Sequence, residues 1–220
     1  MSPSIDNAKC VLVTGATSGI GRALALAIAS LPSHPKVIGV GRRKDRLVGL
    51  TEAGIDAEKF DVNADKAATK NFVEEMIKKY PEIDTLVLAA GIQREVHFKK
   101  EVDLEAIATE MHVNYFSILT IISFFMPHLL AKSLEDTSIG VIEISPPLVE
   151  SELHDAEGTT GALSQFWMPL EEYTKETMEG LQRGVNVVCS GMSKNIYEKF
   201  EQPKERIITE MAKRAATHSK

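Results

Sequence analysis

The sequence predicts an α/β protein with a doubly wound parallel sheet, and three observations predict this class. Short runs of β-branched and apolar residues alternate with helical patterns along almost the whole chain. A glycine-rich turn separates the first of these runs from the first helical segment, as in parallel sheets that bind nucleotides there. With 220 residues, 44% of them hydrophobic, the chain suits a single domain over residues 1–220.

Strands are predicted where apolar runs are too short for a helix. Residues 10–13 read Cys-Val-Leu-Val, which is typical of a strand buried on both faces. Further strands are expected at 36–40, at a segment that Phe60 closes, and at 85–90, 139–144 and 185–189. Pro146 and Pro147 end the fifth strand, because proline cannot donate a hydrogen bond to a ladder.

Helices are predicted first at residues 21–31, 46–53 and 64–80. The segment 21–31 is apolar nearly all round, so we expect it to be sandwiched between other elements. The pattern is clearest at 64–80, where one face carries Ala68, Phe72, Met76 and Tyr80. Asn63 is the expected N-cap of this helix, and Pro81 is its stop signal.

Three more helices are expected at residues 104–130, 170–181 and 195–216. The first should bend near His112 and the last near Pro203. The most apolar stretch, 116–130, is shorter than the about 20 residues that cross a bilayer, so we expect no membrane association.

Charge and cysteine content exclude several protein classes. Asp and Glu (31) outnumber Lys and Arg (25), and no dense basic block occurs, so we expect no nucleic-acid partner. Residues 1–9 lack the apolar segment of a secretory signal. Cys10 and Cys189 are expected to be reduced thiols, and we expect a cytoplasmic location.

The strongest chemical signal is the loop Thr14-Gly15-Ala16-Thr17-Ser18-Gly19-Ile20-Gly21, between the first strand and the first helix. Its three glycines remove the Cβ atoms that would hold a diphosphate away from the backbone. The helix that follows offers free N–H groups and the positive end of its dipole. The alternative is a glycine-rich turn that binds nothing.

Arginines follow the second strand, where dinucleotide-binding sheets that prefer NAD(H) carry an acidic residue. Arg42 and Arg43 favour a 2′-phosphate, and hence NADP(H), because guanidinium groups bind phosphates well. Asp61, just after the third strand, is placed to accept from the adenine amino group. The alternatives are a solvated basic turn and, for Asp61, a helix cap.

These segments resemble the short-chain dehydrogenase/reductase family, which has a Rossmann-type sheet. The resemblance covers residues from about 9 to 130 and resumes at about 133. Within the family the chain looks closest to the DltE-like branch, on the evidence of residues 91–95, 98–100 and 141–149. The resemblance implies NADP(H)-dependent reduction of a small carbonyl compound or oxidation of an alcohol.

Carried over position by position, the resemblance implies specific roles. The diphosphate would bind at Gly15, Ser18, Gly19, Ile20 and Gly21; the 2′-phosphate at Arg42; and the adenine at Asp61 and Val62. The family's Asn-Asn-Ala-Gly turn corresponds to Leu88-Ala89-Ala90-Gly91, which keeps the backbone contacts of Ala89, Ala90 and Gly91 but loses both asparagine side chains. Asn114 matches the asparagine that holds a water in the proton relay.

The family's proton donor is missing from this sequence. In the family a Tyr transfers the proton, a Lys four residues later lowers its pKa, and an upstream Ser orients the substrate. The four tyrosines here are followed at that spacing by Asp84, Leu119, Thr177 and Glu201. The pattern indicates that a strand-plus-helix unit of roughly 40 residues is absent after residue 131, so whether the chain is an enzyme stays uncertain.

This shortening has two structural consequences. Residues 139–144 are hypothesised to fill the vacated place beside the fourth strand. The 104–130 helix would lose its neighbours, leaving unpartnered Ile118, Leu119, Ile121, Ile122, Phe124 and Phe125. We therefore expect poor solubility, a covering partner or a homo-oligomer through this helix.

Three functional interpretations remain open: a weakly active or inactive oxidoreductase, a non-catalytic NADP(H)-binding or partner-binding protein, and a truncated splice or gene-model product. A rebuilt site using Tyr173 and Lys175 is disfavoured, because residues two apart on a helix point to different sides. One acidic cluster with a histidine consists of Glu150, Glu152, His154 and Asp155. Its spacing matches no metal-ligand motif, so we interpret it as a solvated loop in preference to a metal site.

Overall fold

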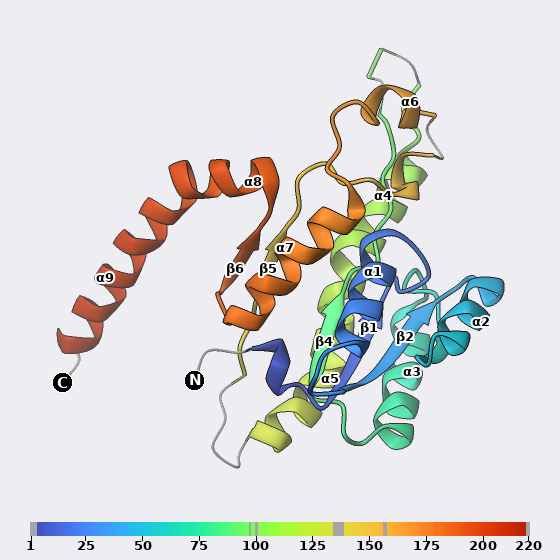
Figure 1. Cartoon of the computed structure of the whole chain (residues 1–220), viewed down its shortest axis with the longest axis horizontal. Helices are drawn as coiled ribbons and strands as arrows, with labels where there is room; N and C mark the ends of the chain where they lie inside the picture. The colour runs from blue at the N-terminus through green and yellow to red at the C-terminus, as the bar shows by residue number, and fades with distance from the viewer. Residues whose placement is uncertain (1–3, 97, 100, 134–138, 156–157, 219–220) are drawn as a thin grey trace.

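The structure is a computed structural model that describes residues 4–96, 98–99, 101–133, 139–155 and 158–218 (Figure 1). Its strands are β1 (Cys10–Thr14), β2 (Lys36–Gly41), β3 (Asp56–Lys59), β4 (Thr85–Leu88), β5 (Glu143–Ser145) and β6 (Val187–Cys189). Its α-helices are α1 (Gly19–Ala29), α2 (Lys44–Glu52), α3 (Lys66–Lys79), α4 (Leu104–Met111), α5 (Ser117–Ser133), α6 (Thr160–Leu163), α7 (Leu170–Arg183), α8 (Gly191–Ile196) and α9 (Gln202–His218). The predicted α/β class is confirmed.

The main sheet is parallel, with strand order β3-β2-β1-β4. Strand β1 is buried along its whole length, because its side chains alternate between two apolar layers. Val11 and Val13 pack with α1, α2 and α7, whereas Cys10 and Leu12 pack with α3 and α5. Helices therefore cover both faces, and the loops that follow β1, β2 and β4 meet at one edge of the sheet.

Strands β5 and β6 form a separate parallel pair. The hypothesis that residues 139–144 fill the place beside β4 is therefore wrong: Glu143 pairs with Val187, and within the described ranges β4 pairs with β1 alone. Helix α7 explains this placement. A Cβ added to Gly180 would lie 2.6 Å from Val188 Cγ1, and Leu181 joins the core layer that contains α1. Packing through α7 therefore attaches the β5–β6 pair to the rest of the fold, because the described strands of the two sheets do not pair with each other.

The helix opposite α3 bends where predicted, and the bend is a π-helical turn at His112–Phe116 between α4 and α5. Its apolar side chains divide in two. Ile121 and Phe125 are buried with α3, and Phe124 packs against the same core layer, so the expectation that these three lack partners was wrong. Leu119, 46% exposed, confirms the expectation for the outer face, and Phe116 is exposed as well.

This helix is longer than the apolar stretch considered from the sequence. Over Leu104–Lys132 its length and composition suffice to cross a bilayer, and 22% of its most apolar window is buried. Its inner side packs on the sheet beside α3, as a core helix does. The absence of membrane association stays a prediction.

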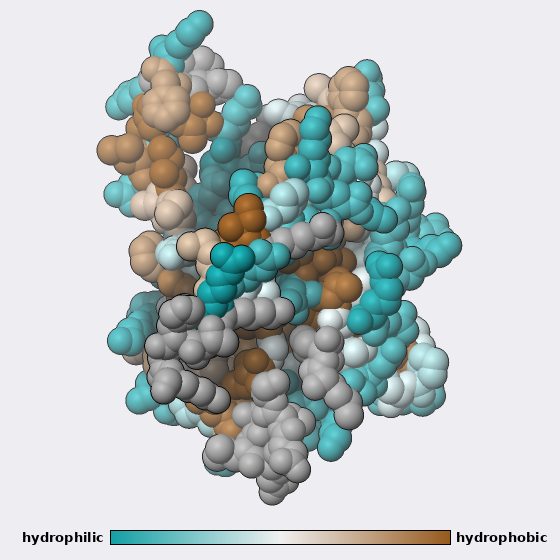
Figure 2. Space-filling view, turned by 90° about the vertical axis from the view of Figure 1, so that its left-hand side faces the viewer, coloured by the Kyte–Doolittle hydropathy of each residue, from teal (hydrophilic) through white to brown (hydrophobic). Residues whose placement is uncertain are grey.

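The C-terminal helices extend away from the sheet (Figure 1). The predicted break at Pro203 falls earlier, at a π-helical turn over Tyr197–Glu201, because proline fits the first turn of the new helix α9. Figure 2 shows hydrophobic side chains at the surface on the side that carries β6, α8 and α9. The large exposed hydrophobic residues of these helices include Met192, Ile196, Phe200, Ile207, Ile208 and Met211.

Candidate functional site

The glycine loop lies against the turn that follows β4. Gly15 has a φ of +69°, and a Cβ there would lie 2.8 Å from both the Ala89 carbonyl oxygen and the Ala90 Cα. A Cβ on Gly21 would lie 2.5 Å from the Gly15 carbonyl oxygen. These two positions therefore require glycine, and the sequence motif is explained by the close approach of three backbone segments.

Helix α1 begins at Gly19, directly on this loop. Ser18 has an extended backbone at the N-cap and makes no side-chain bond to the helix. The first N–H groups of any helix have no intrahelical acceptor, so those of Gly19, Ile20 and Gly21 face the edge of the sheet where β1 ends. The geometry suits an anion, since the helix dipole adds positive potential at the same place.

The two arginines after β2 take different positions. Arg43 Nη2 donates to Thr17 Oγ1 at 3.3 Å and also to Ser18 Oγ, so this guanidinium lies on the glycine loop. Arg42 Nη1 lies 3.7 Å from Asp61 Oδ2, and its side chain is 62% exposed. Both sequence-predicted arginines thus flank the loop, but Arg43 alone contacts it.

Asp61 and Val62 lie beyond Arg42. The Asp61 carboxylate accepts from the Asn63 backbone N–H at 3.0 Å, while Val62 packs at the margin of the α3–α5 core layer. Neither Asp61 nor Asn63 caps helix α3. Asp65 is the N-cap and accepts from the Ala68 N–H at 2.8 Å, because the helix begins two residues later than expected.

Asn114 holds the chain that follows β4. Its Oδ1 accepts from the Ile92 N–H at 2.9 Å, and its Nδ2 donates to the Ile92 carbonyl at 2.7 Å. The π-helical turn at His112–Phe116 carries it there. The Ala90 N–H also reaches Thr14 Oγ1 at 3.3 Å, so this turn is fixed to β1. Asn114 is therefore a positioning residue in this structure, and a water-holding role stays a prediction.

Glu152 is the residue of this site that sequence reasoning missed. Its Oε2 accepts from Arg43 Nη1 at 3.0 Å, and its Oε1 accepts from Arg46 Nη1. The hydrogen bond from Arg46, with a smaller one from Arg43, lowers the pKa of this carboxyl below its usual value. The acidic run 150–155 drew attention to this segment as a candidate metal site, and the described residues contain no metal-binding group. The local sequence did not indicate that Glu152 contacts arginines more than 100 positions away.

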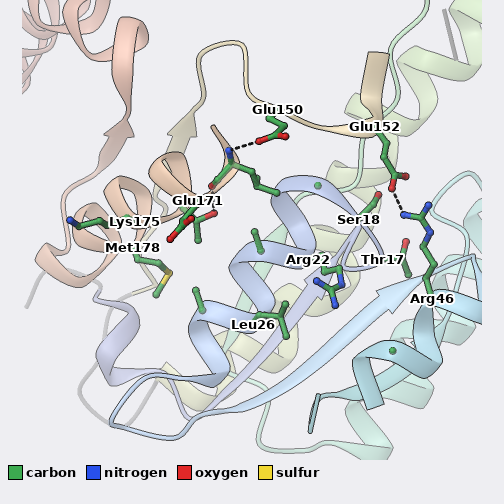
Figure 3. A pocket seen from close by; sticks show the side chains of 16 residues that line it. Thr17, Ser18, Arg22, Leu26, Arg46, Glu150, Glu152, Glu171, Lys175 and Met178 are labelled. Carbon is green, nitrogen blue, oxygen red and sulfur yellow. Dashed lines mark hydrogen bonds and ion pairs between the residues drawn. The ribbon is translucent and has the colours of Figure 1, made fainter. Parts of the chain in front are cut away.

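A groove of about 970 Å³ leads away from the glycine loop between α1 and α7 (Figure 3). Thr17, Ser18 and Arg46 lie at one end, with Glu152 above them, while Lys175 and Met178 lie at the other. Across the groove Glu150 accepts from the Leu170 N–H at 3.3 Å. The 150–152 segment therefore crosses the groove beside the start of α1.

Three of the four tyrosines offer no substitute proton donor at this edge. Tyr173 is 1% exposed, and burial raises its pKa. Tyr80 does lie beside a lysine, Lys79, but at the end of α3 where β4 begins, and its hydroxyl donates to Glu58 at 2.8 Å. Tyr197 donates to Glu205 at 2.6 Å. A Tyr–Lys pair next to the glycine loop is absent from the part of the chain that the structure describes.

The sequence profile of short chain dehydrogenases matches residues 9–146, more than half of the chain. The chain belongs to the short-chain dehydrogenase family. Its relatives include DltE of Bacillus subtilis, an uncharacterised oxidoreductase that is 26% identical over 243 aligned positions, covering 91% of this chain and 95% of the relative. YIR035C of Saccharomyces cerevisiae, another uncharacterised oxidoreductase, is 27% identical over 86% of this chain and 74% of its own length.

Solved structures of the family share this fold. A short-chain dehydrogenase from Sphingobium yanoikuyae in complex with NADPH has a TM-score of 0.73 at 18% identity, covering 91% of this chain and 94% of that one. Serine dehydrogenase complexed with NADP+ has a TM-score of 0.67 at 20% identity, covering 82% and 94%. These likenesses establish the fold, and the DltE match supports the branch that the sequence indicated.

Proposed function

We propose that this short-chain dehydrogenase binds NADP(H) at the edge where β1, β2 and β4 end. The observation that carries the proposal is the glycine loop at the start of α1 with the Arg43 guanidinium lying on it. The backbone supplies N–H donors to a diphosphate, and the guanidinium supplies a charge for a third phosphate. Family structures in complex with NADPH and NADP+ support the same ligand.

The proposed cofactor site is made of residues from the loops that follow β1, β2, β3 and β4 and from the start of α1. Its members are Gly15, Ser18, Gly19, Ile20, Gly21, Arg42, Arg43, Asp61, Val62, Ala89, Ala90 and Gly91. Gly15 and Gly21 fit this role because any side chain there would collide with the backbone of the loop. Arg43 is the better-placed partner of a 2′-phosphate, while Arg42 and Asp61 flank the adenosine.

When bound, a nicotinamide cofactor supplies or accepts a hydride. The chain's own residues must then move a proton to or from a carbonyl or alcohol oxygen, and the described residues hold no Tyr–Lys pair beside the glycine loop for that step. Asn114 fixes the Ile92 backbone at this edge and does not replace the acid. We therefore propose hydride transfer that is impaired or absent.

We attribute the missing pair to a deletion. The alignment with DltE spans 243 positions but draws on 91% of 220 residues, so about 40 positions of the relative lack a counterpart, the size of one strand-plus-helix unit. Separate pairing of β4 and β5 fits a strand missing between them. If the transcript shows an exon skipped between Ala131 and Lys132, the chain is a truncated product of an intact reductase gene.

Nucleotide binding and turnover separate these alternatives. Purified protein should quench or shift NADPH fluorescence on titration, while its oxidation of NADPH with a panel of small carbonyl compounds should be slow or undetectable. Rapid turnover would show a working acid that the structure does not reveal. Absence of binding by folded protein at millimolar nucleotide would remove the proposal altogether.

The proposal includes partners and location. The substrate, if the chain is active, is a small carbonyl or alcohol, and we propose no nucleic-acid or membrane partner in a cytoplasmic, single-domain protein. The exposed outer face of α4 and α5 favours a homo-oligomer through this helix, because large apolar side chains such as Phe116 and Leu119 gain from burial. Sedimentation analysis that yields a stable monomer would contradict this part.

A further inference from the structure

We propose that the Glu152 carboxylate is an internal competitor of the cofactor's phosphate: it occupies the guanidinium groups of Arg43 and Arg46, and a bound phosphate must displace it. The inference rests on the proposed NADP(H) site and adds a residue that sets its affinity. It makes Glu152, outside the glycine loop, a determinant of preference between NADP(H) and NAD(H).

The hydrogen bonds of the Glu152 carboxylate place it where the site would bind a phosphate. Arg43 uses one terminal nitrogen on Ser18 and Thr17 and the other on Glu152, at 3.0 Å. Arg46 binds the second oxygen of the same carboxylate. One carboxylate thus bridges two guanidinium groups at the edge of the loop, as a phosphate does with its own oxygens. Figure 3 shows the bond between Glu152 and Arg46.

Buried neighbours hold Glu152 in place. Val149 is 4% exposed and His154 is 6% exposed, so the chain is anchored on both sides of the glutamate. Ser151 caps the short 3-10 turn that follows by accepting from the Leu153 N–H. A Cβ on Gly19 would lie 3.3 Å from Ser151 Cβ, which shows that this segment crosses directly over the start of α1.

The displacement is feasible because the side chain itself is not packed. Glu152 is 44% exposed and Arg43 is 37% exposed, so water can solvate both groups when they separate. A 2′-phosphate brings almost two negative charges and three acceptor oxygens against one charge and two oxygens. Phosphate therefore displaces the carboxylate at sufficient concentration, but the competing carboxylate reduces the apparent affinity for phosphate.

Glu150 provides a matched control in the same segment. It lies two residues away, lines the same groove and has the same charge, but its carboxylate accepts from the Leu170 N–H and contacts neither arginine. A general change in charge near the site affects both glutamates alike. A specific competition affects Glu152 alone.

The test compares wild type, Glu152→Gln and Glu150→Gln. Each protein is titrated with NADPH and with NADH, and each is melted with and without inorganic phosphate. We expect Glu152→Gln to bind NADPH about fivefold more tightly, the range that a half-exposed ion pair allows, with little change for NADH. We also expect inorganic phosphate to raise its Tm more than that of the other two proteins.

The phosphate melts keep this inference separate from the proposed function. If phosphate raises the Tm of Glu152→Gln more than that of the other proteins and none of the proteins binds NADPH, the result supports the competition and overturns the proposed NADP(H) site. Equal phosphate shifts in the three proteins, or NADPH binding that is unchanged or weaker in Glu152→Gln, overturn the competition whatever the cofactor is.

Discussion

Asn114 makes two hydrogen bonds to the backbone of Ile92: its Oδ1 accepts from the N–H at 2.9 Å, and its Nδ2 donates to the carbonyl oxygen at 2.7 Å. This pairing copies the hydrogen bonds of a neighbouring strand. It fixes the segment after β4, where the chain lacks the asparagines of its family's turn. The segment after β4 is therefore held by a side chain that a π-helical turn delivers, together with the bond from the Ala90 N–H to Thr14 Oγ1.

Asn114→Ala should lower the free energy of unfolding by about 1–2 kcal/mol, because two hydrogen bonds are lost at an exposed position. A thermal melt should show a Tm reduced by several degrees. Asn195→Ala, at an exposed position on α8, is the control and should melt like wild type. Equal melting of all three proteins would show that this amide does not hold the turn.

Gly21→Ala should weaken NADPH binding by about tenfold or more, because the added Cβ meets the Gly15 carbonyl and forces the loop open. Gly49→Ala is the matched control: nothing lies within 4 Å of its Cβ, and alanine favours helix α2. Fluorescence titration and circular dichroism measure both. NADPH affinity that survives in Gly21→Ala would place the nucleotide elsewhere.

Arg43→Ala should weaken NADPH binding about tenfold while NADH binding changes little, because the guanidinium faces the glycine loop and recognises the extra phosphate. Lys44→Ala, next along the chain and exposed, controls for the lost positive charge. The ratio of the two dissociation constants is the quantity to measure. Parallel losses for the two nucleotides would rule out 2′-phosphate recognition at Arg43.

Alkaline pH should destabilise the fold through Tyr80. Burial, with the hydrogen bond to Glu58, raises its pKa to about 12. Because the folded state disfavours the tyrosinate, this contribution is complete below about pH 10, the unfolded pKa, and is lost as pH rises through 12. Burial raises the pKa of Cys10 to about 12 as well, so it adds to the loss.

Tyr80→Phe should therefore make Tm fall less steeply between pH 10 and pH 12 than it does in wild type. Thermal melts across this range provide the slopes. Identical slopes in wild type and Tyr80→Phe would mean that Tyr80 titrates alike in both states.

Phe116→Lys combined with Leu119→Lys should reduce self-association and the binding of a dye that reports apolar surface, since both residues are exposed on one helix. Val48→Lys, an exposed apolar position on α2, is the control for added charge. Light scattering and dye fluorescence give the result. Undiminished association in the double variant would locate the interface on another surface, such as α8 and α9.

Sequence reasoning recovered what local pattern dictates. The buried run in β1 and the glycine loop follow from spacing alone, and the structure places both as expected. On the predicted face of α3, Phe72, Met76 and Tyr80 are buried as expected, but Ala68 is exposed and Thr69 is buried in its place. Gly15 and Gly21 were identified from the motif, and the close backbone contacts at both positions supply the reason.

The misses come from contacts between distant segments. The pairing of β5 depends on how α7 packs Gly180 on Val188, which a three-residue strand does not encode. Burial of Ile121 and Phe125 depends on which side of α5 meets α3. Glu152 reaches Arg43 and Arg46 only after the chain has crossed the sheet, so its carboxylate looked like part of a solvated acidic loop.

Calorimetric titration of the wild-type protein with NADPH, on a sample whose cooperative thermal transition shows that it is folded, tests the central claim most directly. We predict a saturable heat with one nucleotide per chain and weaker binding of NADH. A folded protein that gives no saturable heat with millimolar NADPH would contradict the assignment of the glycine loop and Arg43 as a phosphate-binding site.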